Sequence, residues 1–245
     1  MKIIASDYDG TFNRNGITEF KKEALAKWRR EGNLFGIISG RGYPSLKECI
    51  DSHPFEYDFL VCNNGAVIYN TDGKIMFEAR CEGAKAKPFI EDLFLWGCPM
   101  ANIDKDIPIR IINTTDTIDE DEIYLSQLPE IEYFNQISTY LETAEAAAEV
   151  VKKIEDKYSS VLTPLQNGNC IDTVPLGVNK AQGLYSLLEV IGGAYEDIIA
   201  VGDDINDTHM IGEFRSYAME NGVDSIKALA DYIIADVTEI IEKEI

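Results

Sequence analysis

Short apolar runs alternate with segments of helical period along most of the chain, which is the pattern of an α/β fold. These runs predict buried strands at residues 2–7, 34–39, 59–62, 197–201, 217–219 and 232–234. Helical segments follow most of them, at residues 18–31, 44–51, 180–190, 225–230 and the C-terminus, with one more after residues 202–207. The alternation predicts a core in which helices cover a parallel sheet.

Local signals mark where several of these elements begin, end or turn. Thr18 is a good N-cap for the helix at 18–31, and Gly32 is a good stop for it. Thr71-Asp72-Gly73 lies between the apolar runs 66–69 and 74–77, which predicts a hairpin after the third strand.

A block of different character then interrupts the rhythm. It carries helical patterns at 84–97 and 143–158, strand patterns at 108–113 and 131–139, and a hairpin formed by 161–166 and 169–174. Its polar residues Arg110, Asn113 and Asn169 are candidates for contacting a ligand. We therefore expect residues 1–80 and 178–245 to form the core domain, and residues 81–177 to form an inserted α+β domain.

Composition narrows the class of protein. The chain has 245 residues, of which 45% are hydrophobic, and it contains no apolar run long enough to span a membrane. The N-terminal apolar stretch reaches a charge at Asp7, which is too short for a signal peptide, so we expect a cytoplasmic protein. Five scattered cysteines are expected to be free thiols, and nothing in the sequence indicates an oligomeric state.

The net charge of −21 argues against nucleic acid and anionic membranes as partners. A phosphorylated ligand would need a local positive site to overcome this field. The densest acidic segment, at 116–122, is expected to be a solvated loop or a helix start.

The segment Asp7-Tyr8-Asp9-Gly10-Thr11 directly follows the first predicted strand. Two carboxylates this close repel each other unless a cation lies between them. The glycine allows a sharp turn, and Thr11 adds a hydroxyl group. This segment therefore predicts a cation site and favours phosphoryl-transfer chemistry.

Further polar residues are expected at the same edge of the sheet, where parallel strands end. Hydroxyl and backbone N–H groups can hold phosphate oxygens, a lysine can neutralise them, and carboxylates can hold Mg²⁺. The residues concerned are Ser39, Gly40, Lys180, Asp203 and Asp207.

Four segments in order resemble the four motifs of the haloacid dehalogenase superfamily of phosphatases. They are 7–11, Ser39-Gly40-Arg41, Lys180 and 202–207. Asn63-Asn64-Gly65-Ala66 and Gly177-Val178-Asn179-Lys180 resemble the Cof-type sugar-phosphate phosphatases of that superfamily. The resemblance implies a Rossmann-like core with a parallel sheet and an inserted α+β cap domain.

The resemblance also implies roles for individual residues. Asp7 would attack phosphorus and become an aspartyl phosphate, and Asp9 would act as general acid and then general base. The Asp7 carboxylate, the Asp9 backbone carbonyl and Asp203 would hold Mg²⁺. The phosphoryl oxygens would be bound by Ser39, Gly40, Lys180 and Asn206. Around them, Thr11 would support the site, Asp207 would act through water or orient Lys180, and Arg41 would contact substrate or form an ion pair.

The expected function is Mg²⁺-dependent hydrolysis of a small phosphorylated metabolite, with a sugar phosphate as the first expectation. Phosphoglycolate, pyridoxal phosphate and flavin phosphates stay open as substrates. A phosphomutase of the same superfamily, a phospho-aspartate switch or sensor, and a silent sugar-phosphate-binding protein are the alternatives.

Overall fold

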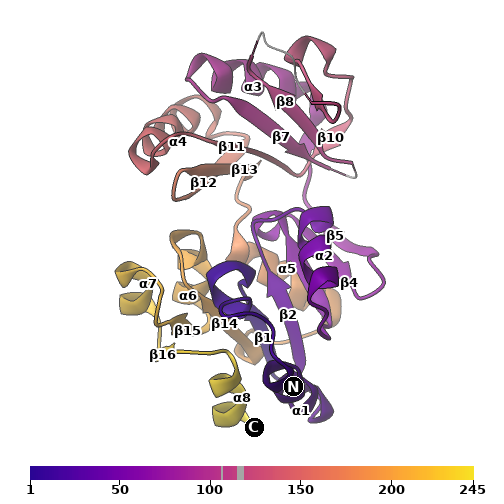
Figure 1. Ribbon diagram of the computed structural model, residues 1–245, viewed down its shortest axis with the longest axis vertical. Helices are drawn as coiled ribbons and strands as arrows, with labels where there is room; N and C mark the ends of the chain where they lie inside the picture. The colour runs from indigo at the N-terminus through magenta and orange to yellow at the C-terminus, as the bar shows by residue number, and fades with distance from the viewer. Residues whose placement is uncertain (106, 115–118) are drawn as a thin grey trace. The chain divides into compact units, whose positions relative to one another are not determined.

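The computed structural model describes residues 1–105, 107–114 and 119–245. The chain forms two compact units, which we call the core unit (Met1–Phe77 and Asn179–Ile245) and the inserted unit (Glu78–Val178). Figure 1 shows the core unit as indigo to purple and orange to yellow ribbon, and the inserted unit as magenta to salmon ribbon. Asp116, at the start of the acidic segment 116–122, lies outside the described residues.

The core unit is built on an eight-stranded sheet in the order β16-β15-β14-β1-β2-β3-β4-β5. From β16 to β3 all neighbouring strands are parallel, and β4 pairs antiparallel with β3. The strands are β1 (Ile3–Ser6), β2 (Leu34–Ile38), β3 (Phe59–Cys62), β4 (Val67–Asn70), β5 (Ile75–Glu78), β14 (Ile198–Gly202), β15 (Arg215–Met219) and β16 (Tyr232–Ile234).

Helices cover both faces of this sheet, because successive side chains of a strand point to opposite faces. Ile4 packs with the cluster that includes Leu25 and Trp28, whereas Ile3 packs with the cluster that includes Leu184. One face carries α1 (Glu19–Arg30), α2 (Tyr43–Ser52) and α8 (Thr238–Glu244). The other carries α5 (Lys180–Ile191), α6 (Thr208–Glu213) and α7 (Asp224–Leu229). The predicted α/β class is confirmed.

The predicted local signals are present in the core unit. The Thr18 side chain accepts a hydrogen bond from the Lys21 N–H and caps α1. Gly32 follows that helix with a φ of 81°, a conformation that glycine adopts without strain. The predicted hairpin after the third strand is formed by β4 and β5.

The inserted unit has its own sheet, in the order β12-β13-β11-β7-β8-β9. Its strands are β7 (Met100–Asp104), β8 (Ile109–Ile112), β9 (Glu122–Ile123), β11 (Gln136–Tyr140), β12 (Leu162–Asn167) and β13 (Cys170–Pro175). The helices α3 (Ala86–Leu95) and α4 (Ala144–Tyr158) share one hydrophobic core with this sheet. A separate short pair joins β6 (Cys81–Glu82) to β10 (Tyr133–Phe134).

Several strands of the inserted unit differ from the sequence-based expectation. The single strand expected at 131–139 is divided at Asn135 into β10 and β11, which belong to different sheets. The strands β6, β7 and β9 were not predicted, and Glu122, at the end of the acidic segment expected to be a loop or a helix start, lies in β9. None of the helices in the described part of the chain is long and apolar enough to cross a bilayer.

Candidate active site

The candidate site is built where β1 and β14 end side by side. These strands are parallel neighbours, so Asp7 and Asp203, which follow them, come to the same edge of the sheet. The Asp7 N–H donates to the Val201 carbonyl at 2.8 Å, which extends the pairing by one residue and fixes the start of the loop.

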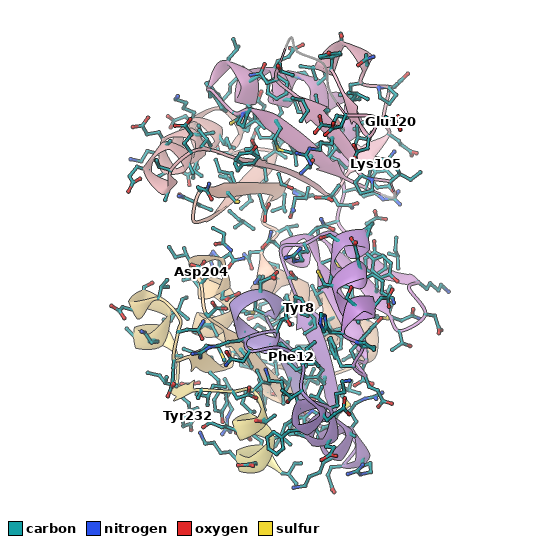
Figure 2. All side chains as sticks on the ribbon, viewed as in Figure 1. Tyr8, Phe12, Lys105, Glu120, Asp204 and Tyr232 are labelled. Carbon is teal, nitrogen blue, oxygen red and sulfur yellow. The ribbon has the colours of Figure 1, made fainter. Side chains whose placement is uncertain are left out.

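The turn at Tyr8–Phe12 brings the loop after β1 against Asp203. Gly10 has a φ of 77°, and a Cβ atom there would lie 2.3 Å from an Asp203 carboxylate oxygen. Tyr8 and Phe12 are buried and anchor the turn in the core (Figure 2). At the end of this turn, the Lys21 ammonium group of α1 donates to the Phe12 carbonyl at 2.8 Å. Both the positive φ and the nearby Asp203 carboxylate therefore favour glycine at position 10.

A buried ammonium group joins two carboxylates at the centre of the site. Lys180 Nζ lies 2.6 Å from Asp7 Oδ1 and 2.5 Å from Asp207 Oδ1. Burial alone would lower the pKa of Lys180, but Asp207 and Asp7 together raise it above its ordinary value. Lys180 is therefore a fixed positive charge inside this site.

The carboxylate of Asp207 also closes the loop after β14. Its Oδ2 accepts from the backbone N–H groups of Asp203 at 2.8 Å and Asp204 at 3.2 Å. A Cβ atom on Gly202 would lie 2.4 Å from that same oxygen, so a small residue is needed there. Asp207 thus holds both the conformation of this loop and the position of the Lys180 ammonium group.

Asp203 is held from two further sides. Thr11 Oγ1 donates to its Oδ1 at 2.5 Å. Asn221 Nδ2 donates to the Gly10 carbonyl at 3.0 Å and lies 3.4 Å from Asp203 Oδ2. Asn221 was not singled out from the sequence, because it lies far along the chain and carries no motif.

The three carboxylates Asp7, Asp203 and Asp207 fit a divalent cation. One oxygen from each lies within 4.8 Å of the others. Burial raises the pKa of Asp7 to about 8, an effect that Lys180 opposes and the other two carboxylates reinforce, and burial raises the pKa of Asp203 as well. A cation among these oxygens would offset that cost, and hard divalent ions prefer carboxylate oxygen. The donor set therefore fits a metal ion.

The position of Lys180 depends on close contact between two backbones. A Cβ on Gly65 would lie 2.3 Å from the Asn179 carbonyl oxygen, and a Cβ on Gly183 would lie 2.6 Å from the Gly65 Cα. The first turn of α5 therefore packs directly on the loop after β3. The Asn179 side chain caps the helix by accepting from the Gln182 N–H at 3.0 Å.

Ser39 lies in a second loop beside this cluster, at the end of β2. It is buried, and its Oγ accepts from the Arg41 N–H at 3.2 Å. The Asn64 N–H donates to the Ser39 carbonyl at 2.9 Å, and the Asn63 N–H donates to the Arg41 carbonyl at 2.9 Å. The loops after β2 and β3 are thereby tied together.

Asn63 adds an observation that the sequence did not supply. It is 3% exposed, and its Nδ2 has no hydrogen-bond partner among the described residues. Its φ of 52° explains why asparagine suits this turn.

The other carboxylate of the first loop has a different partner. Arg41 donates to Asp9 through Nε at 2.6 Å and through a terminal nitrogen at 3.0 Å. The remaining sequence candidates lie on the same loops: Gly40 is half-buried between Ser39 and Arg41, and Asn206 is half-buried in the turn Ile205–Asp207. Direct bonds in the described chain join Asp7, Lys180, Asp207, Asp203 and Thr11, and separately Asp9 and Arg41.

The three polar candidates of the inserted unit each have a partner within that unit. Arg110 pairs with Glu122 at 3.0 Å. Asn113 Nδ2 donates to the Cys98 carbonyl at 3.2 Å, and Asn169 Nδ2 donates to the Leu141 carbonyl at 2.7 Å. These bonds explain all three residues as parts of the local structure.

The chain belongs to the haloacid dehalogenase-like hydrolase family, whose model matches residues 4–240. The predicted family is thereby confirmed, and the predicted enzyme class, a phosphatase, is confirmed by the similar proteins that follow.

Three known proteins are similar to this chain over most of its length. It is 25% identical over 247 residues to 5-amino-6-(5-phospho-D-ribitylamino)uracil phosphatase YbjI of Escherichia coli, covering 95% of this chain and 90% of that one. It is also 25% identical over 276 residues to pyridoxal phosphate phosphatase YbhA of Escherichia coli, covering 97% and 94%. A solved haloacid dehalogenase-like hydrolase from B. subtilis has the same fold, with a TM-score of 0.83 and 18% identity over the full length of both chains.

Proposed function

We propose that this protein is a Mg²⁺-dependent phosphomonoesterase that hydrolyses a small phosphorylated metabolite through an aspartyl-phosphate intermediate on Asp7. The observation that carries the proposal is the buried contact of Lys180 with Asp7 and Asp207, next to Asp203. A carboxylate can approach a phosphate dianion only where positive charge neutralises both. Lys180 supplies part of that charge.

The Asp7 carboxylate, the Asp9 backbone carbonyl and Asp203 are the residues that would hold Mg²⁺. When bound there, the ion would neutralise phosphoryl oxygens and lower the repulsion between them and the nucleophile. Asp207, the third carboxylate of the cluster, would orient Lys180 rather than bind the ion, because both its oxygens already accept hydrogen bonds. Thr11 would orient Asp203.

In the first half-reaction, an Asp7 oxygen forms a bond to phosphorus while the bond from phosphorus to the ester oxygen breaks. The carboxyl group of Asp9 gives its proton to the departing oxygen. Ser39, the Gly40 amide, Lys180 and Asn206 would bind the phosphoryl oxygens.

In the second half-reaction, Asp9 takes a proton from water as that water attacks phosphorus. The bond between phosphorus and the Asp7 oxygen breaks, which releases inorganic phosphate and restores both carboxyl groups.

The substrate class follows from charge and from the similar proteins. The net charge of −21 disfavours nucleic acid, so a small molecule is the better candidate. YbjI is named as a phosphatase of 5-amino-6-(5-phospho-D-ribitylamino)uracil, and YbhA as a phosphatase of pyridoxal phosphate. These two phosphate esters and sugar phosphates are therefore the first substrates to assay. We assign selection of the leaving group to the inserted residues 81–177.

The test is a phosphatase assay with p-nitrophenyl phosphate and a panel of these phosphate esters, with Mg²⁺ and with chelator. We expect turnover that requires Mg²⁺ and falls by about a thousand-fold or more in Asp7→Asn. Asp204→Asn is the matched control, because its carboxylate caps the neighbouring Ile205 N–H rather than joining the cluster.

Full activity in Asp7→Asn would contradict the mechanism. A long-lived phosphoenzyme without turnover would favour the switch or sensor. Transfer of the phosphoryl group within a bisphosphorylated sugar would favour the mutase.

A further inference from the structure

Asp9 is held by a side chain that comes from another strand end. Two nitrogens of the Arg41 guanidinium donate to the two Asp9 carboxylate oxygens, at 2.6 and 3.0 Å. A third nitrogen donates to Ser45 Oγ at 3.1 Å. This fork-to-fork arrangement fixes the plane and the direction of the carboxylate, which a single hydrogen bond would not do.

The guanidinium itself is anchored through the Arg41 backbone. The Arg41 N–H donates to Ser39 Oγ, and its carbonyl accepts from the Asn63 N–H. Ser45 in the first turns of α2 holds the outer end of the side chain. The direction of Asp9 is therefore set by the loop after β2, the same loop that contains Ser39.

We propose that Arg41 is the positioning residue of Asp9: its guanidinium holds the Asp9 carboxyl group where a proton can pass to the leaving oxygen and later be taken from water. The proposal rests on the proposed function of Asp9 as general acid and base.

The proton balance is unchanged by Arg41, because a guanidinium neither gives nor takes the proton. Each Asp9 oxygen keeps a second lone pair beside the one that accepts from Arg41, and that lone pair can carry the proton. In the first half-reaction the proton moves from Asp9 to the ester oxygen as its bond to phosphorus breaks. In the second half-reaction a proton moves from water to Asp9. Correct placement of the carboxyl group matters most when the leaving oxygen is strongly basic and needs that proton in the transition state.

This dependence gives a readout that a general structural defect would not produce. The values of kcat/KM are measured with p-nitrophenyl phosphate, whose leaving group departs without a proton, and with phenyl phosphate and an alkyl phosphate such as glycerol phosphate. We expect Arg41→Met to lower kcat/KM by about 30-fold to 100-fold for the alkyl phosphate and by less than about 3-fold for p-nitrophenyl phosphate. Arg41→Lys keeps the charge but loses the fork, so its kcat/KM for the alkyl phosphate should lie between the values of the unchanged protein and Arg41→Met.

A double-mutant cycle isolates the route through Asp9. Asp9→Asn should show the same dependence on the leaving group, and adding Arg41→Met to it should cause no further loss. Ser45→Ala should show a weaker form of the Arg41→Met pattern. The matched control is Arg29→Met, which removes a similar forked pair with Asp58 just before β3 and should leave all three substrates unaffected.

Equal losses for all three substrates in Arg41→Met, or losses that multiply in the double variant, would overturn the proposal and indicate that Arg41 contacts the substrate directly. Failure of the proposed function would look different, because Asp7→Asn would then keep its activity whatever Arg41 does.

Discussion

Two carboxylates of the loop after β1, Asp7 and Asp9, each form an ion pair, and the two ion pairs differ in burial. In the first, Lys180 and Asp7 have side chains that are 0% and 10% exposed. In the second, Arg41 and Asp9 are 39% and 51% exposed. Removing one partner of a buried pair leaves an unpaired charge in a medium of low dielectric constant. Removing one partner of an exposed pair leaves a charge that water can solvate. We therefore expect the first pair to govern folding as well as charge neutralisation, and the second to govern geometry alone.

The largest effect should come from Lys180→Met. This change leaves Asp7 and Asp207 buried beside each other without a cation, and we expect a loss of about 3–5 kcal/mol in the free energy of unfolding. Urea unfolding in chelator measures it, with Lys22→Met as control because Lys22 forms a pair with the exposed Glu19. A loss below about 1 kcal/mol would remove the distinction between the two pairs.

The next effect tests the space around the buried carboxylates. Gly10→Ala and Gly16→Ala both place alanine at a positive φ, 77° and 79°, and share a strain of about 1–2 kcal/mol. At Gly10 the new Cβ also meets Asp203, whereas nothing lies within 4 Å of it at Gly16. We expect Gly10→Ala to cost a further 1–3 kcal/mol, roughly, and to raise the Mg²⁺ concentration needed for half-maximal activity. Equal losses in the two variants would mean that Asp203 moves freely.

The half-buried carboxylate of Asp104, which has no lysine partner among the described residues, extends the comparison. Burial raises the pKa of Asp104 to about 7, and Asp172 adds to this, although hydrogen bonds from Ser138 and Gln136 oppose it. Because the folded state holds this proton more tightly than the unfolded state, the stability it contributes is lost as pH rises from about 4 to about 7. Asp104→Asn should therefore stabilise the protein at pH 8 by about 1–2 kcal/mol, and by much less at pH 4.

Asp92→Asn is the control of opposite sign. Burial would raise the pKa of Asp92, but hydrogen bonds from Lys157 and Tyr158 lower it overall. Its removal should reduce stability at neutral pH, with a smaller effect in acid. Urea unfolding at the two pH values measures both variants, and the same sign in both would contradict the assignment.

The smallest effect on stability is expected for Arg41→Met. Its pair with Asp9 is exposed, so we expect a change of less than about 1 kcal/mol in the free energy of unfolding. Thermal and urea unfolding of this variant beside Lys180→Met complete the comparison. A loss as large as that of Lys180→Met would show that the exposed pair is also structural.

The sequence predicted the edge of the sheet at which these residues meet, because that conclusion needs only strand order and the direction of parallel strands. Asp7 and Asp203 follow apolar runs that could be recognised locally, and Lys180 opens a helix with a clear cap. The bidentate pairing of Arg41 with Asp9 was not predictable, since it depends on the conformations of two loops that are distant in sequence.

The elements that were missed in the inserted unit depend on distant partners in the same way. β7 is stabilised by pairing with β8 and β11, so its own five residues carry little signal. The expected strand at 131–139 is divided because Asn135 turns its side chain to Glu78 and the Ala79 carbonyl.

In the core unit, the close approach of Gly65 and Gly183 likewise depends on two backbone segments that are distant in sequence, so the sequence alone does not reveal it.

The central claim is that the phosphoryl group passes to Asp7. The most direct measurement is mass spectrometry of the Asp9→Asn variant, quenched in acid soon after mixing with Mg²⁺ and p-nitrophenyl phosphate. With the general base removed, hydrolysis of the phosphoenzyme should slow, and we predict one phosphoryl group on the peptide that contains Asp7. A phosphoryl group on another residue, or steady release of phosphate from Asp7→Asn, would contradict the account.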